Sequence, residues 1–151
     1  MKTIKSLFVK SLDLILVLTC LIAVAASFYF LPKTNGPVPI HWNLWGEVDQ
    51  YGNKVFGLFL LPVISLICLI LFWLIPKIDP LKGNLKQFPT AFQILKASVV
   101  LLFLYLHIIV LVATFATPNV PSPFVFSAPF SLFFIILGAI MPHFKRNYFA
   151  G

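Results

Sequence analysis

The sequence predicts an all-α integral membrane protein, a bundle of about four transmembrane helices with both termini in the cytoplasm. Of its 151 residues, 60% are hydrophobic and only 10% are charged. A soluble domain of this size could not bury so much apolar surface in one core. Four apolar runs are each long enough to cross a bilayer. These runs do not alternate as barrel strands must, and a backbone in lipid must satisfy its own hydrogen bonds, which favours helices.

Apolar runs and the prolines between them divide the chain into its predicted elements. The predicted spans cover residues 8–31, 56–75, 94–116 and 124–142, within a single membrane domain over residues 1–151. Because proline lacks a backbone donor and clashes with the preceding turn, proline clusters predict the boundaries. These clusters are Pro32, Pro37 and Pro39, then Pro76 and Pro80, then Pro118, Pro121 and Pro123, and finally Pro142. Two prolines inside spans, Pro62 and Pro129, predict kinks rather than breaks.

Lysine and arginine in the short loops predict the orientation. Nine of the 11 basic residues fall in the N-terminal tail, the loop 76–92, the beginning of the third span and the C-terminal tail. The loop 32–55 holds only Lys33 and Lys54, and the loop between the third and fourth spans holds none. Because loops rich in basic residues stay in the cytoplasm, we expect the loop 76–92 inside and the loop 32–55 outside.

A competing interpretation concerns the N-terminus. Three lysines precede an apolar run that contains Ala23-Val24-Ala25, a pattern typical of a signal-peptidase site. The apolar run continues from Phe28 to Leu31, however, and is then long enough to span. We therefore expect a retained helix rather than a cleaved signal peptide.

The extracytoplasmic loop 32–55 is the most informative stretch, because it combines a histidine, two tryptophans, a tyrosine, two acids and several glycines. One interpretation is an interfacial loop, with aromatic side chains at the membrane surface and glycines in turns. The other is a recognition surface, because aromatic anchors beside hydrogen-bonding groups suit peptide binding. A metal site of His41, Glu47 and Asp49 is a third, but one histidine and two carboxylates at loose spacing are a weak signal. We predict no metal and no other cofactor.

His107 lies near the middle of the third predicted span. An ionisable group at that depth is a functional candidate by default. A neutral imidazole can also hydrogen-bond to another helix and serve only in packing. Both interpretations stay open, since no second intramembrane acid is placed to form a relay with it. Asp13, one turn from Lys10, is expected to pair locally or to reach the interface.

Charge and motifs exclude several classes of function. The formal net charge of +7 falls between apolar runs, which predicts contact with anionic lipid headgroups rather than nucleic acid. No hydrolase triad, metalloprotease motif or nucleotide-binding fingerprint is visible, so we predict that the protein is not an enzyme.

Two stretches of the first loop carry a motif: Pro37-Val38-Pro39-Ile40-His41-Trp42-Asn43 and Gly46-Glu47-Val48-Asp49-Gln50-Tyr51-Gly52-Asn53-Lys54. Together they resemble the signature of an uncharacterised bacterial membrane domain that commonly forms the N-terminal part of SdpI-like immunity proteins. Asp79-Pro80 and Asn84, leading to Phe88, resemble the next cytoplasmic loop of that family. Near the end of the chain, a third set of residues resembles the start of the family's C-terminal signature: Gly138, Met141-Pro142, Asn147-Tyr148-Phe149 and Gly151.

The resemblance implies immunity against a secreted peptide toxin in a bacterial cytoplasmic membrane, with signal relay through a transcriptional repressor held at the inner face. The first loop would face the toxin and the basic cytoplasmic segments would face the repressor. The implied recognition residues are His41, Trp42, Asn43, Gly46, Glu47, Asp49, Tyr51, Gly52 and Lys54. The alternative, from another class, is a small transporter or membrane enzyme component that uses His107 or the group of His41, Glu47 and Asp49.

The chain also departs from the family at its end. In the family, the C-terminal signature continues with glycine, a hydrophobic residue and Arg-Thr-Pro-Trp, followed by further helices. This chain stops at Gly151. We therefore expect a fragment or a truncated member.

Overall fold

The computed structural model describes residues 2–85, 87–115 and 122–146. Some residues used in the sequence analysis lie outside this part. They are Lys86 of the loop 76–92 and Ala116, which ends the third predicted span. Pro118 and Pro121 of the following loop and the motif residues Asn147, Tyr148, Phe149 and Gly151 also lie outside it.

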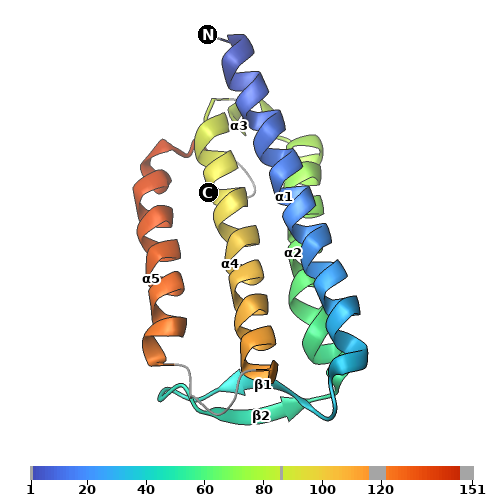
Figure 1. Ribbon diagram of the computed structural model, residues 1–151. Helices are drawn as coiled ribbons and strands as arrows, with labels where there is room; N and C mark the ends of the chain where they lie inside the picture. Colours follow the sequence, from blue (N-terminus) through green and yellow to red (C-terminus); the bar gives the residue numbers. More distant parts are fainter. Residues whose placement is uncertain (1, 86, 116–121, 147–151) are drawn as a thin grey trace.

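The protein is an all-α membrane bundle with one small two-stranded sheet (Figure 1). Its long helices are α1 (Lys2–Phe30), α2 (Lys54–Ile78), α4 (Pro89–Phe115) and α5 (Pro123–Ile140). The short elements are η1 (Leu31–Lys33), β1 (Val38–Trp42), β2 (Val48–Gly52), α3 (Lys82–Leu85) and η2 (Met141–His143). Four segments with a mean hydropathy between 2.3 and 3.0 are long enough to span a membrane. The chain is therefore a multi-pass membrane protein.

Each of the four long helices begins before the apolar run that predicted it. Helix α2 begins at Lys54, two residues before its predicted span, because the side chain of Asn53 accepts a hydrogen bond from the backbone N–H of Val55 at 2.8 Å. Helix α4 begins at Pro89 instead of residue 94, and proline suits the first turn of a helix. Hydropathy alone places such boundaries too late, since capping and backbone geometry decide where a helix begins.

Helix α4 is the centre of the bundle. It packs against α1, α2 and α5, and α1 also packs against α2. Helix α5 packs mainly on α4 and leaves most of its apolar surface exposed, as expected of a helix that faces lipid. We call the end that carries the sheet the hairpin end, and the opposite end the α3 end (Figure 1).

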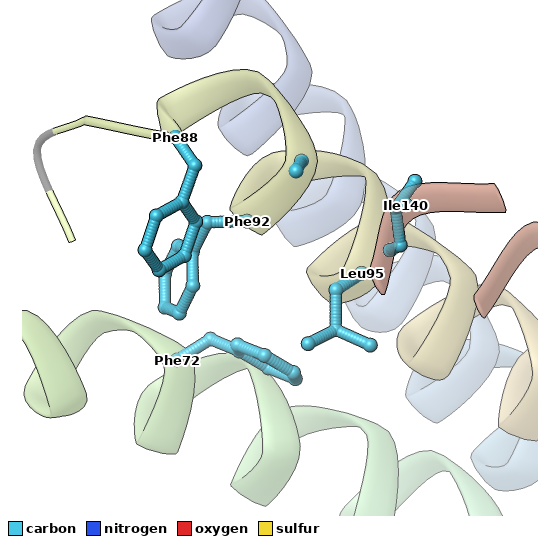
Figure 2. Close-up of a cluster of buried hydrophobic side chains, with 6 residues drawn as sticks. Phe72, Phe88, Phe92, Leu95 and Ile140 are labelled. Atoms are coloured by element: carbon cyan, nitrogen blue, oxygen red, sulfur yellow. The ribbon is translucent and has the colours of Figure 1, made fainter. Parts of the chain in front are cut away.

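Buried side chains form three apolar layers along the bundle. At the α3 end, Phe72 of α2 meets Phe92 of α4 edge to face, with ring centroids 5.6 Å apart (Figure 2). Ile140 of α5 closes this layer. A middle layer joins α1, α2 and α4 through Leu16, Cys20, Leu69, Val100 and Leu104. The third layer, at the hairpin end, is centred on Val38, Leu58 and Val110.

Hydroxyl groups of neighbouring helices compensate for two of the three prolines inside α2 and α5; the third, Pro76, was predicted as a boundary but lies inside the last turn of α2. Pro62 cannot donate to the carbonyl of Leu58, and the Ser27 hydroxyl of α1 donates to that carbonyl at 2.7 Å. Pro129 likewise cannot donate to Val125, whose carbonyl accepts from the Tyr105 hydroxyl of α4 at 3.0 Å. Both helices continue through Pro62 and Pro129, and the carbonyl freed by each of these prolines has a partner inside the protein.

A buried ion pair joins α1 to α4 near the α3 end. The ammonium of Lys96 lies 2.5 Å from a carboxylate oxygen of Asp13, and the Lys96 side chain is only 4% exposed. The amide of Gln93 also donates to this carboxylate, at 3.2 Å. The predicted local pairing of Asp13 with Lys10 is therefore wrong, because helix packing brings a buried cation closer than the neighbouring turn does.

Contacts at the α3 end tie the segment after α5 to the loop before α4. The side-chain amide of Asn84 donates to the backbone carbonyl of Arg146 at 2.7 Å. The rings of Phe88 and Phe144 lie 4.8 Å apart between centroids. The described C-terminal segment thus lies at the same end as α3 and the start of α1 (Figure 1).

Candidate functional site

The loop 32–55 folds into an antiparallel β-hairpin at one end of the bundle (Figure 1). Val38 lies opposite Gly52 and Trp42 lies opposite Val48, with irregular pairing on both sides of His41. The sequence analysis expected a loop here and did not predict strands. Two five-residue strands interrupted by prolines and glycines give too short an alternation of apolar and polar residues to be recognised.

Asn43 organises the turn between the two strands. Its side-chain oxygen accepts hydrogen bonds from the backbone N–H groups of Trp45 at 2.9 Å and Glu47 at 3.0 Å. Its side-chain amide donates to the Glu47 carboxylate at 2.8 Å. Gly46 has a φ of 82°, a conformation that favours glycine. Asn43 and Gly46, which the family resemblance implies as recognition residues, therefore shape the turn.

A second polar pair links the two strands. Nδ1 of His41 lies 2.5 Å from Oδ1 of Asp49, and the two side chains are 63% and 42% exposed. Glu47 points to Asn43 instead of joining this pair. Among the described residues, no group of three or more metal-ligating side chains is assembled. His41, Glu47 and Asp49 thus lie on one hairpin but form two separate hydrogen-bonded pairs.

A glycine of α2 lets the hairpin dock on the bundle. Val38 of β1 is fully buried, and a Cβ atom built on Gly57 would lie 2.7 Å from its Cγ1 atom. Within the hairpin, a Cβ atom on Gly52 would lie 2.9 Å from Cδ1 of Ile40. Sequence reasoning missed Gly57, although an isolated glycine inside an apolar helix is a signal of close approach.

Two further contacts hold the hairpin in place. The Trp42 ring packs against Phe126 of α5 at 5.1 Å between centroids. Its Nε1 atom is buried and has no hydrogen-bond partner among the described residues. The ammonium of Lys54 donates to the carbonyl of Thr34 at 3.3 Å and so ties the start of α2 to the segment before β1. Trp42 and Lys54 therefore act partly in holding the hairpin.

The turn of the hairpin exposes large apolar side chains. Leu44 is 89% exposed and Trp45 is 73% exposed, and Tyr51 of β2 is also exposed. Glu47 and Asp49 of the same hairpin are exposed as well. An anchored hairpin that exposes aromatic and acidic groups can bind a partner without first becoming ordered.

His107 lies apart from the exposed hairpin surface and is 1% exposed. Its Nε2 atom is 3.4 Å from the Ser27 hydroxyl, which donates to the carbonyl of Leu58. When that hydroxyl donates to the carbonyl, its contact with His107 requires a proton on Nε2. Ser27 lies three residues before the end of α1, so His107 lies nearer the hairpin end than the sequence predicted.

An apolar layer separates His107 from Lys96, another buried polar residue of α4. Nδ1 of His107 is buried without a hydrogen-bond partner in the described part of the chain. Val100 and Leu104 lie between His107 and Lys96 along α4, and both belong to the middle apolar layer. The polar contacts of His107 and Lys96 therefore connect helices at two levels of α4, with apolar side chains of α4 between them.

Comparison with known proteins recognises only the first part of the chain. Residues 15–66 match a family described as a domain of unknown function, DUF1648. No curated protein and no solved structure matches the chain. The matched stretch contains most of α1, the whole hairpin and the first half of α2. The stretch that carries the first-loop motif, the hairpin included, thus matches a domain that is itself uncharacterised.

Proposed function

We propose that this protein recognises a secreted peptide toxin through the hairpin, outside a bacterial cytoplasmic membrane, and protects the cell that makes the protein. The feature that carries the proposal is a hairpin fixed to the bundle by Val38 and Gly57 that exposes Trp45, Glu47 and Asp49. Exposed aromatic and charged side chains on a preordered element are typical of binding hot spots.

Charge supports the proposed orientation. The basic residues that predict a cytoplasmic side lie in the segments of the α3 end, and the hairpin occupies the opposite end. The α3 end would then contact anionic lipid and, in a relay function, a transcriptional repressor. The contact between Asn84 and Arg146 joins two basic segments there into one surface.

The alternative function, a transporter or membrane enzyme, has less support from the geometry. His107 is sealed among α1, α2 and α4, and its side-chain partner among the described residues is Ser27, whose hydroxyl donates to a backbone carbonyl. His41, Glu47 and Asp49 form hydrogen bonds in two pairs. We therefore favour a non-enzymatic function without a cofactor.

A survival assay tests the proposal. A sensitive bacterium that expresses the protein is challenged with the concentrated secreted peptides of the organism that encodes it. We expect better survival than with the empty vector. Replacing His41, Trp45, Glu47 and Asp49 together by alanine should abolish protection and leave the membrane level unchanged, because all four are exposed and contribute little to packing.

The matched control is Ile78→Ala. It removes an apolar side chain at the α3 end that is as exposed as Trp45. This variant should protect as the wild type does. Survival equal to that of the empty vector, with the wild-type protein correctly inserted, would show that immunity is not the function. A fully protective quadruple variant would mean that the hairpin is an interfacial tether.

A further inference from the structure

A groove lies between the hairpin and the bundle. It has a volume of about 540 Å³ and is bounded by β1, α2, α4 and α5. Its walls are mainly apolar and include Trp42, Leu61, Val110, Phe126 and Phe130. This volume lies within the range of pockets that hold small ligands or the anchoring side chains of a peptide.

The polar rim of the groove carries negative charge. His41 and Asn43 line the groove, and each is hydrogen-bonded to a carboxylate, that of Asp49 at 2.5 Å and that of Glu47 at 2.8 Å. Both carboxylates are on exposed residues. Even a protonated His41 would neutralise only one of the two charges, so the rim attracts cations.

The two lysines at this end of the molecule are engaged elsewhere. The ammonium of Lys33 lies over the Tyr29 ring, 3.3 Å from its centroid, and that of Lys54 donates to the carbonyl of Thr34. The loops of this end contain no other lysine or arginine. An occupant of the groove that carries a positive charge would therefore meet carboxylates at the rim.

We propose that the groove takes apolar side chains of a cationic amphipathic peptide whose lysine or arginine side chains pair with Glu47 and Asp49. This inference rests on the proposed function and states which class of peptide the hairpin recognises. A phospholipid is the competing occupant of an apolar groove in a membrane protein. Its phosphate would lie beside the two carboxylates, however, and like charges at an interface oppose binding.

The test uses the full chain in discs of phosphatidylcholine, with empty discs as the reference. The probes are a labelled amphipathic helix of leucine and lysine, and the same helix with glutamate in place of lysine. We expect binding of the lysine peptide above the reference, weakening with salt, and no binding of the glutamate peptide.

Two variants separate the rim from the groove. Glu47→Gln combined with Asp49→Asn keeps acceptors for Asn43 and His41 and removes both charges, so affinity should fall by about tenfold or more. Ser127→Trp places a large ring in the groove without altering the hairpin and should have a similar effect. The control is Ser131→Trp, one turn further along α5 on an exposed residue that does not line the groove.

The outcomes distinguish this inference from the proposed function. Unchanged peptide affinity in the groove and rim variants would overturn the inference, and release of a copurified phospholipid by Ser127→Trp alone would assign the groove to lipid. In the survival assay, the groove and rim variants could protect the cell while the quadruple alanine variant does not. The proposed function would then stand, and the groove would have no part in it. Absence of protection by the wild type would remove both.

Discussion

At the residue scale, single hydroxyl groups determine how proline is accommodated in the bundle. Ser27 and Tyr105 each donate to the carbonyl that a proline of another helix leaves free. In lipid, such a carbonyl has no water to bond with, so its partner must come from the protein. Ser27 has a second neighbour in His107, which makes this histidine part of the same structural contact.

The proline contact predicts a specific coupling. Ser27→Ala should lower the apparent Tm in detergent, because the Leu58 carbonyl loses its partner, at a cost of about 0.6–2 kcal/mol. In a Pro62→Ala background, residue 62 regains its N–H and can bond to that carbonyl. The effect of Ser27→Ala should then become much smaller.

Ser98→Ala is the control for this cycle, since the Ser98 hydroxyl bonds to the carbonyl of Ile94 in its own helix. It should change the Tm little in either background. Equal losses for Ser27→Ala with and without Pro62 would show that the hydroxyl does not act through the freed carbonyl.

At the element scale, the hairpin and the bundle fit together because α2 has a glycine, Gly57, where the hairpin approaches it. Val38 occupies the space beside Gly57, and Gly52 leaves room for Ile40 inside the hairpin. The motif glycines therefore have different functions. Gly46 adopts a positive φ in the turn, whereas Gly52 permits a close approach.

Replacing Gly57 should loosen the hairpin. Gly57→Ala adds a Cβ atom less than 3 Å from Val38, so β1 must move away from the bundle. We expect faster hydrogen exchange over residues 38–52 and little change in the helices. Val38→Ala in the same background should restore only part of the protection from exchange, because it removes Cγ1 and leaves the Cβ atom, which lies 2.8 Å from the added atom.

The control is Gly138→Ala in α5, where an added Cβ atom would have no neighbour within 4 Å. This substitution should leave hydrogen exchange in the hairpin unchanged and slightly favour the helix, since alanine has the higher helix propensity. Unaltered exchange in the Gly57→Ala variant would mean that the hairpin is not held through this contact.

At the scale of the whole molecule, charge and architecture give the same division into two ends. The hairpin lies at one end and the basic segments at the other (Figure 1). Polar contacts inside the bundle, Asp13 with Lys96 and His107 with Ser27, lie on either side of the middle apolar layer. Such contacts can fix the register of α1 against α4, because a slipped helix would leave a buried charge unpaired.

The orientation can be measured by cysteine labelling. In a background without Cys20 and Cys68, an impermeant thiol reagent applied to whole cells should label Leu44→Cys at the exposed turn. Gly83→Cys in α3, where an added side chain meets open space, should react only after the membrane is permeabilised. Labelling of Gly83→Cys alone in intact cells would invert the proposed orientation.

Composition and the spacing of prolines were enough to predict the fold class and the approximate positions of the four helices. A span is recognised from composition within a window of about 20 residues, and proline acts on its own helix, so both signals are local along the chain. The hairpin motif was also visible as a distinctive set of residues. The match of residues 15–66 to an uncharacterised domain likewise needed no knowledge of how the two strands pair.

Only the tertiary structure decided which residues meet. Nothing near Asp13 in the sequence indicates Lys96, and nothing near Val38 indicates Gly57. Spans that are apolar all round give a weak rotational signal, so their sequence does not state which face contacts another helix. The partners of Ser27 and His107, and the hairpin's fit against α2, follow from how the helices pack, which is a property of the whole molecule.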